Sequence, residues 1–121
     1  MLTFPPTVRV FLCTRHTDLR QGFDRLAALV TGHLELDPLC GHLFVFKNKR
    51  ADRLKILYWD CSGYCLWYKR LEAGTFAFPE SGVAEHGQAG REIRSADLLM
   101  LLEGIDPARA QRRTRYHRPV S

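Results

Sequence analysis

The residues best suited to binding chemistry lie in one short stretch, residues 53–70, which reads RLKILYWDCSGYCLWYKR. It holds two tryptophans, three tyrosines and two lysines on either side of a polar turn. Aromatic rings beside cations are suited to a nucleic-acid backbone and to stacking on unpaired bases. Nucleic-acid contact is therefore one hypothesis for this stretch, and protein contact and ordinary core packing are the alternatives.

The face on which each ring lies depends on the register of the hairpin that this stretch predicts. A three-residue loop at residues 61–63, with Gly63 in the left-handed position, is a favoured connection, and it places Lys55 directly across from Lys69. Two like charges in that position cost stability unless an anion lies near them. A two-residue loop would give a different register that mixes the faces. The three-residue loop predicts a core face of Leu54, Ile56, Tyr58, Tyr64, Leu66 and Tyr68, and an opposite face of Lys55, Leu57, Trp59, Cys65, Trp67 and Lys69.

The net charge of +5 is concentrated at the C-terminal end. Five of the 18 Lys and Arg residues follow Asp106, where no Asp or Glu occurs, so the 13 remaining cations balance the 13 anions. A neutral body with a basic arm favours an anionic polymer such as DNA as partner, and a solubilising tail is the alternative. We call Lys55, Trp59, Trp67 and Lys69 of the hairpin the Lys/Trp face. The predicted DNA-contacting residues are this face, Arg70 and the five arginines of the arm: Arg109, Arg112, Arg113, Arg115 and Arg118.

The remaining reactive side chains indicate neither a metal site nor a catalytic set. The four cysteines are expected to be reduced thiols, and the spacings Cys13-x-x-His16, Cys40-x-His42 and Cys61-x3-Cys65 contain no paired CxxC motif. The carboxylates could bind Mg²⁺ in a nuclease, but each has a simpler expected role. Asp18 can cap a helix, and Asp24 can pair with Arg20 one turn away. Asp52 and Asp60 lie in turns that favour Asp. We therefore predict no catalytic residue, no cofactor and no enzymatic activity, with a metal-dependent nuclease as the least favoured alternative.

The elements that must position these residues follow from the hydrophobic pattern. The sequence predicts a strand at 7–13, a helix beginning at Thr17 or Asp18, three or four strands within 42–78 and a loop at 79–90. It also predicts a helix at 95–103, with Ser95 as its N-cap and Gly104 as its C-terminal stop. Together they predict an α+β fold, an antiparallel β-meander of about five strands with the two α-helices mainly on one face. We expect a single α+β domain at 1–106 and a flexible, Arg-rich C-terminal tail at 107–121.

No apolar run reaches the ~20 residues of a membrane span, and the first residues do not resemble a secretion signal. These features predict a cytoplasmic protein without membrane contact.

Four blocks of sequence, taken in order, resemble one family. They are TDLRQGFDRLAALV (17–30), DPLCGHLFVFKNKRADRLKILYWD (37–60), CLWYKRLEAGTFAFP (65–79) and LLEGID (101–106). Together they resemble the small accessory protein, often labelled TnpB, of the sixty-six family of bacterial insertion sequences, which is distinct from the guide-RNA nuclease that shares the label. Lys55, Trp59 and Lys69 match the family pattern, whereas Cys13, Cys40 and Cys61 depart from it.

The resemblance implies a helper in DNA transposition, encoded beside a larger transposase that carries the catalytic residues. Its implied partners are DNA at the transposon ends, the transposase and a sister accessory protein of the same element, with a homo-oligomer as a further possibility and a nucleoid-associated location. A purely protein-binding adaptor without DNA contact is the alternative.

Overall fold

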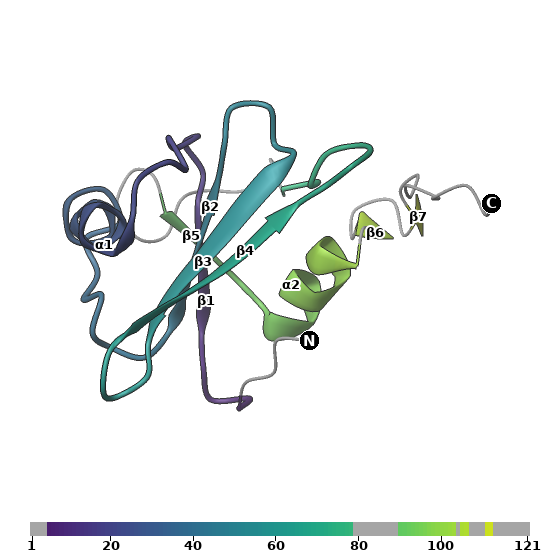
Figure 1. Cartoon of the computed structure of the whole chain (residues 1–121). Helices are drawn as coiled ribbons and strands as arrows, with labels where there is room; N and C mark the ends of the chain where they lie inside the picture. Colours follow the sequence, from purple (N-terminus) through teal and green to yellow (C-terminus); the bar gives the residue numbers. More distant parts are fainter. Residues whose placement is uncertain (1–4, 79–89, 104, 107–110, 113–121) are drawn as a thin grey trace.

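The computed structural model describes residues 5–78, 90–103, 105–106 and 111–112 (Figure 1). Among these residues, the first helix follows the first strand, and the second helix comes after a run of four further strands. In order, the elements are β1 (Val10–Cys13), α1 (Phe23–Gly32), β2 (Leu43–Lys47), β3 (Arg53–Trp59), β4 (Tyr64–Arg70), β5 (Gly90–Ile93), α2 (Ser95–Leu102), β6 (Ile105–Asp106) and β7 (Gln111–Arg112).

A five-stranded mixed sheet with the strand order β4-β3-β2-β1-β5 forms the centre of the molecule. The predicted α+β class is confirmed, but the prediction that every strand is antiparallel is wrong, because β1 and β2 are parallel. Helix α1 connects these two strands, and a crossover of this length is what a parallel pair needs. Strand β5 pairs with the other edge of β1, directly after the segment predicted as a loop. Strands β6 and β7 form a separate antiparallel pair.

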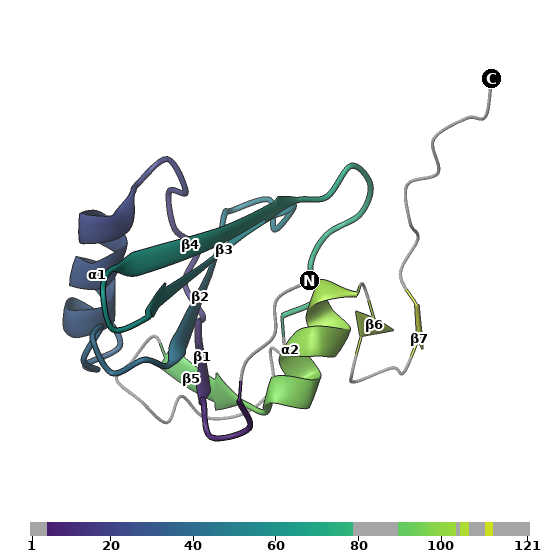
Figure 2. The same ribbon diagram turned by 60° about the horizontal axis from the view of Figure 1, so that its bottom comes forward.

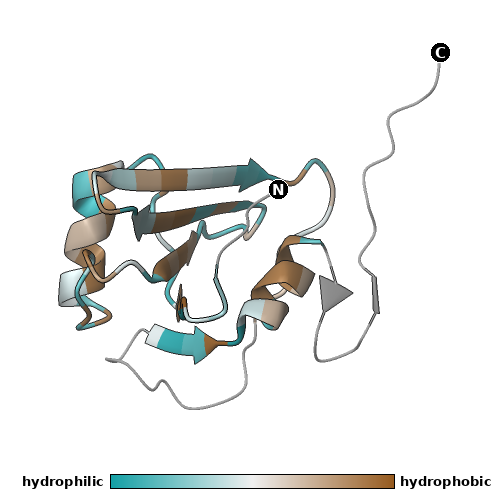
Figure 3. Ribbon diagram, turned by 90° about the horizontal axis from the view of Figure 1, so that it is seen from below, coloured by the Kyte–Doolittle hydropathy of each residue, from teal (hydrophilic) through white to brown (hydrophobic). Residues whose placement is uncertain are grey.

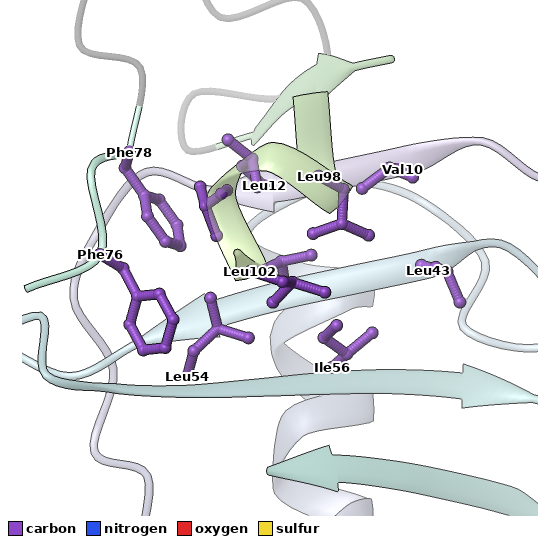
Figure 4. Packing of buried hydrophobic residues seen from close by; sticks show 11 residues of the cluster. Val10, Leu12, Leu43, Leu54, Ile56, Phe76, Phe78, Leu98 and Leu102 are labelled. Carbon is purple, nitrogen blue, oxygen red and sulfur yellow. The ribbon is translucent and has the colours of Figure 1, made fainter. Parts of the chain in front are cut away.

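The two helices lie on opposite faces of this sheet, so the prediction that both cover one face is wrong (Figure 2). Every residue of β1 and the first four of β2 are buried, which shows that both faces of the central strands are covered. The cluster on the α1 face contains Phe11, Cys13, Leu19, Leu26, Ala27, Val30, Leu34, Phe44, Phe46 and Leu57. The cluster on the α2 face contains Val10, Leu12, Leu43, Val45, Leu54, Ile56, Phe76, Phe78, Leu98, Leu101 and Leu102 (Figure 4).

Helix α1 begins later than the sequence predicted. Its N-cap is Gly22, in extended backbone, and Asp18 lies in the preceding loop, where it pairs with Arg20 instead of capping the helix. The expected pairing of Arg20 with Asp24 is therefore not observed. Gly22 is not inside the helix as the pattern indicated, and a Cβ atom there would meet nothing within 4 Å.

Helix α2 follows the sequence prediction to within one residue at each end. It spans Ser95–Leu102, with Arg94 rather than Ser95 at the N-cap position. Arg94 forms an ion pair with Asp97 in the first turn (3.0 Å between Nη2 and Oδ1). Gly104, the predicted C-terminal stop, lies outside the described residues. Neither helix in the described part of the chain has the length and apolar character to cross a membrane.

Candidate nucleic-acid interface

The β3–β4 hairpin has a register one residue away from the predicted one. Lys55 lies across from Tyr68 and Leu54 lies across from Lys69, so the two lysines are not opposite each other. The connection spans four residues, 60–63, and the residue with positive φ is Cys61 (80°) rather than Gly63.

Asp60 holds this turn in its observed shape. Its Oδ1 accepts hydrogen bonds from the backbone N–H groups of Ser62 (3.3 Å) and Gly63 (3.1 Å). These bonds and one from the Cys65 thiol lower the pKa of the Asp60 carboxyl. These hydrogen bonds stabilise a four-residue connection, one residue longer than the loop predicted from the position of Gly63.

The observed register divides the predicted Lys/Trp face between the two sides of the sheet. Lys55 and Trp59 lie on the α1 side, and Lys69 and Trp67 lie on the α2 side. Trp67 packs against the α2-side cluster, and the Trp59 ring meets the Tyr64 ring edge-on with centroids 5.2 Å apart. The single exposed surface of two indoles and two lysines is therefore not formed.

Three of the predicted DNA-contacting cations, Lys55, Lys69 and Arg70, are bonded within the protein. Lys69 Nζ donates a hydrogen bond to the carbonyl oxygen of Leu102 at the end of α2 (3.0 Å). Arg70 Nη2 lies 2.9 Å from Glu72 Oε1, with both side chains more than half exposed. Arg112 lies in β7, whereas Arg109, Arg113, Arg115 and Arg118 lie outside the described residues.

The structure places Lys55 in a groove of about 670 Å³ that opens beside the α1 face of the hairpin. Three segments line it: the loop between β1 and α1, the turn between β2 and β3, and the adjoining ends of β3 and β4. Figure 3 shows hydrophilic residues at this end of β4. We call this groove of three segments the basic groove. Its lining residues are His16, Thr17, Asp18, Leu19, Arg20, Asn48, Lys49, Arg50, Asp52, Arg53, Lys55 and Tyr68.

Tyr68 is fixed in the basic groove by two cations, yet 49% of it is exposed. Lys55 Nζ lies 5.0 Å from the centre of the Tyr68 ring and donates a hydrogen bond to the carbonyl oxygen of Gln21 (3.1 Å). Arg53 Nη1 donates to the Tyr68 hydroxyl (3.3 Å). These contacts hold an accessible aromatic ring among positive charges.

Both carboxylates of the basic groove already have partners. The hydrogen bonds from Arg20 hold the pKa of the Asp18 carboxyl at about 2. The Asn48 side-chain amide donates to Asp52 Oδ1 (2.7 Å) and lowers the pKa of that carboxyl. The lining therefore carries five Lys or Arg side chains against two ionised carboxylates, which is a local excess of positive charge.

Lys49 and Arg50 supply the least constrained part of that charge. Both are exposed, and neither makes a hydrogen bond or ion pair with another residue in the described part of the chain. The sequence predicts Lys55 of this groove as a DNA contact but not Arg20, Lys49, Arg50 or Arg53. The signal that points to most of them is the run KNKRADRLK (47–55), which contains five cations and one anion.

A metal centre finds no support in the side-chain arrangement. Across the described ranges, no group of three or more His, Cys, Asp or Glu residues is placed to hold a metal ion. Cys13 is buried, which raises the pKa of its thiol, whereas Cys40 and Cys61 are exposed. The Cys and His residues of the three spacings noted in the sequence therefore do not form such a group among the described residues.

Comparison with known proteins places the chain in a family. Residues 8–112 match the family described as IS66 Orf2 like protein. The uncharacterized protein y4hO of Sinorhizobium fredii is 44% identical over 106 residues, which cover 88% of each chain. The uncharacterized protein y4jC of the same organism is 38% identical over 106 residues, covering 88% of this chain and 86% of its own. No solved structure matches significantly. The chain therefore belongs to the IS66 Orf2-like family and is an accessory protein of an insertion sequence.

Proposed function

We propose that this accessory protein acts without catalysis in transposition, by contacting DNA at the transposon ends and associating with the transposase. Family membership is the observation that carries the proposal. Five arginines follow Asp106 without an intervening acid, and the basic groove adds cations at a second place. Positive charge gathered in this way favours a polyanionic partner.

The role of the hairpin in this proposal is narrower than the sequence predicted. Lys55 lines the basic groove, and Arg70 is exposed near the end of β4. Contact of Lys69, Trp59 or Trp67 with DNA stays a prediction. These side chains are partly buried and contact Leu102, Tyr64 and the α2-side cluster, respectively, so they are less accessible to DNA than Arg70.

The proposal of a non-catalytic role is supported by the state of the carboxylates. Asp18 is bonded to Arg20 and Asp52 to Asn48, so neither is an open ligand for the Mg²⁺ ions that assist phosphoryl transfer. We infer that the transposase supplies the chemistry, while this protein supplies charge and surface. Residues 1–106 would form the domain, and residues 107–121 the basic arm.

Measuring the salt dependence of binding to transposon-end duplex DNA tests this proposal. If all five arginines of the arm contact phosphates, their replacement by glutamine should make the log–log slope of affinity against salt shallower by about 4.5, because each contact contributes about 0.9. The same variant should keep its melting temperature. A wild-type protein that binds the transposase but shows no salt-dependent DNA affinity would instead be a protein-binding adaptor.

A further inference from the structure

We infer that the basic groove binds a segment of single-stranded DNA, with Tyr68 as the platform on which one unpaired base stacks. This inference rests on the proposed function, since it assumes that DNA is the partner, and it names the form of DNA that the groove selects. It assigns a binding site to residues other than the arginines of the C-terminal arm.

The charges of the groove are placed to follow a phosphate backbone. Lys49 and Arg50 are exposed in the turn between β2 and β3, and Arg20 lines the groove from the loop before α1. Lys49 and Arg50 make no hydrogen bond or ion pair with other described residues, so contact with phosphate would not require an internal bond to break. Phosphate binding would also relieve the mutual repulsion of these cations.

Tyr68 adds an exposed aromatic ring to the groove, which contact with phosphates alone would not require. Arg53 bonds its hydroxyl and Lys55 lies against its ring, while about half of its surface stays open to solvent. A ring fixed in this way loses little conformational freedom when a base stacks on it. An aromatic platform within a positively charged groove is the arrangement by which proteins bind single strands.

Duplex DNA does not use such a platform well. Paired bases present only their edges in the grooves of the helix, and their faces are covered by neighbouring pairs. An unpaired base exposes its face, so the ring of Tyr68 discriminates between the two forms of DNA, whereas Lys49 and Arg50 do not. The groove, at about 670 Å³, has the size of a small-ligand site, which suits a few nucleotides more than the width of a duplex.

The experiment compares fluorescence anisotropy of labelled single-stranded and duplex oligonucleotides bound by the full-length protein. Tyr68→Leu should weaken single-strand binding by roughly 5- to 160-fold, the range produced by loss of one base–aromatic stack, and should change duplex binding much less. Tyr68→Phe keeps the ring and should retain most of the affinity. Arg50→Ala should make the single-strand salt slope shallower by about 0.7, the share of one phosphate contact.

Arg25→Ala is the matched control for Arg50→Ala, because Arg25 is also exposed, makes no ion pair with a described residue and does not line the groove. Its slope should equal that of the wild type.

If the wild type binds single strands while Tyr68→Leu and Arg50→Ala bind like Arg25→Ala, the inference about the groove is overturned and the proposed contact through the arm stands. If the wild type binds neither form of DNA, both the groove and the proposed DNA contact are overturned. Because Arg50 is exposed in a turn, its variant tests the groove even if Tyr68→Leu fails to fold.

Discussion

At the scale of single residues, the two hairpin lysines have different positions despite their similar sequence surroundings. Both donate to backbone carbonyl oxygens, Lys55 to Gln21 and Lys69 to Leu102. Lys55 remains at the edge of the basic groove, whereas Lys69 neutralises the carbonyl end of α2 from the other side of the sheet. A lysine in the sequence indicates a positive charge, but only the contacts show where that charge acts.

Lys69→Met is expected to lower the free energy of unfolding by about 1 kcal/mol, because the terminal carbonyl of α2 loses a charged donor. Urea denaturation monitored by circular dichroism measures the change. Lys49→Met is the control, since Lys49 is exposed and bonded to no other described residue, and it should stay within about 0.5 kcal/mol of the wild type. Equal effects of the two substitutions would contradict the proposed role of Lys69.

The Asp18–Arg20 ion pair should make the stability of the protein depend on pH only under acid conditions. Its carboxyl has a pKa lowered from 3.8 to about 2 by Arg20, so the folded state binds fewer protons than the unfolded state in that interval. The stabilisation from the ion pair is present above pH 3.8 and is lost as the pH falls toward 2. It is small, because both side chains are well exposed.

Asp18→Asn removes this titrating group, so the stability difference between wild type and variant should shrink to nothing between pH 3.8 and about 2. Urea midpoints across this interval provide the measurement. Arg20→Gln should reproduce the result, because it removes the other half of the same pair. A difference that stays constant across the interval would show that Asp18 acts through something other than its charge.

At the scale of elements, the glycine before α1 and the glycine before β2 differ in whether their backbone conformation requires glycine. Gly22 caps α1 in extended backbone that any residue adopts, whereas Gly41 precedes β2 with a φ of 84°. A Cβ atom at Gly41 would meet only the carbonyl oxygen of Trp59, at an ordinary 3.8 Å. The requirement for glycine at Gly41 therefore comes from its backbone angle and not from crowding.

Gly41→Ala is expected to destabilise the protein by about 1–2 kcal/mol, the cost of a left-handed conformation for a residue with a side chain. Gly22→Asp should instead stabilise it by about 1 kcal/mol, because it adds a capping oxygen and a negative charge at the start of α1. Thermal unfolding of the two variants checks the opposite signs. A loss of stability for Gly22→Asp would mean that the N-cap position needs glycine for a reason absent from the observed geometry.

At the scale of the whole molecule, the sheet separates two hydrophobic clusters while its strands belong to both. Ile56 faces the α2 side and its neighbour Leu57 faces the α1 side, and both are fully buried. The clusters therefore share backbone but not side-chain contacts. Substitutions in different clusters should act independently, although the shared strands make the molecule unfold as one unit.

Val30→Ala on the α1 side should cost about 2 kcal/mol and Ile56→Val on the α2 side about 1 kcal/mol, from lost burial and residual cavities. The double variant should lose the sum to within about 0.5 kcal/mol. Equilibrium denaturation of the four proteins completes this cycle. A larger coupling energy would show that the two clusters rearrange together across the sheet.

The sequence by itself determined the α+β class, the regions of β1 to β4 and of the two helices, the family and the excess of positive charge after Asp106, whereas β5, β6 and β7 were not predicted. Apolar periodicity is a local property of the chain, which is why α2 was predicted to within one residue at each end. The four blocks that carry the family resemblance are likewise read directly from residue order.

Only the tertiary structure decided which side chains share a surface. A shift of one residue in the β3–β4 register moves the side chains of one strand to the opposite face relative to the other strand. The observed register goes with a four-residue turn in which Asp60 accepts hydrogen bonds from the backbone. The helices cover opposite faces because the side chains of β1 and β2 are apolar on both sides of the sheet, so each side needs a helix to bury it. The basic groove brings together the loop before α1, the turn after β2 and the end of β4, segments whose proximity arises only from folding.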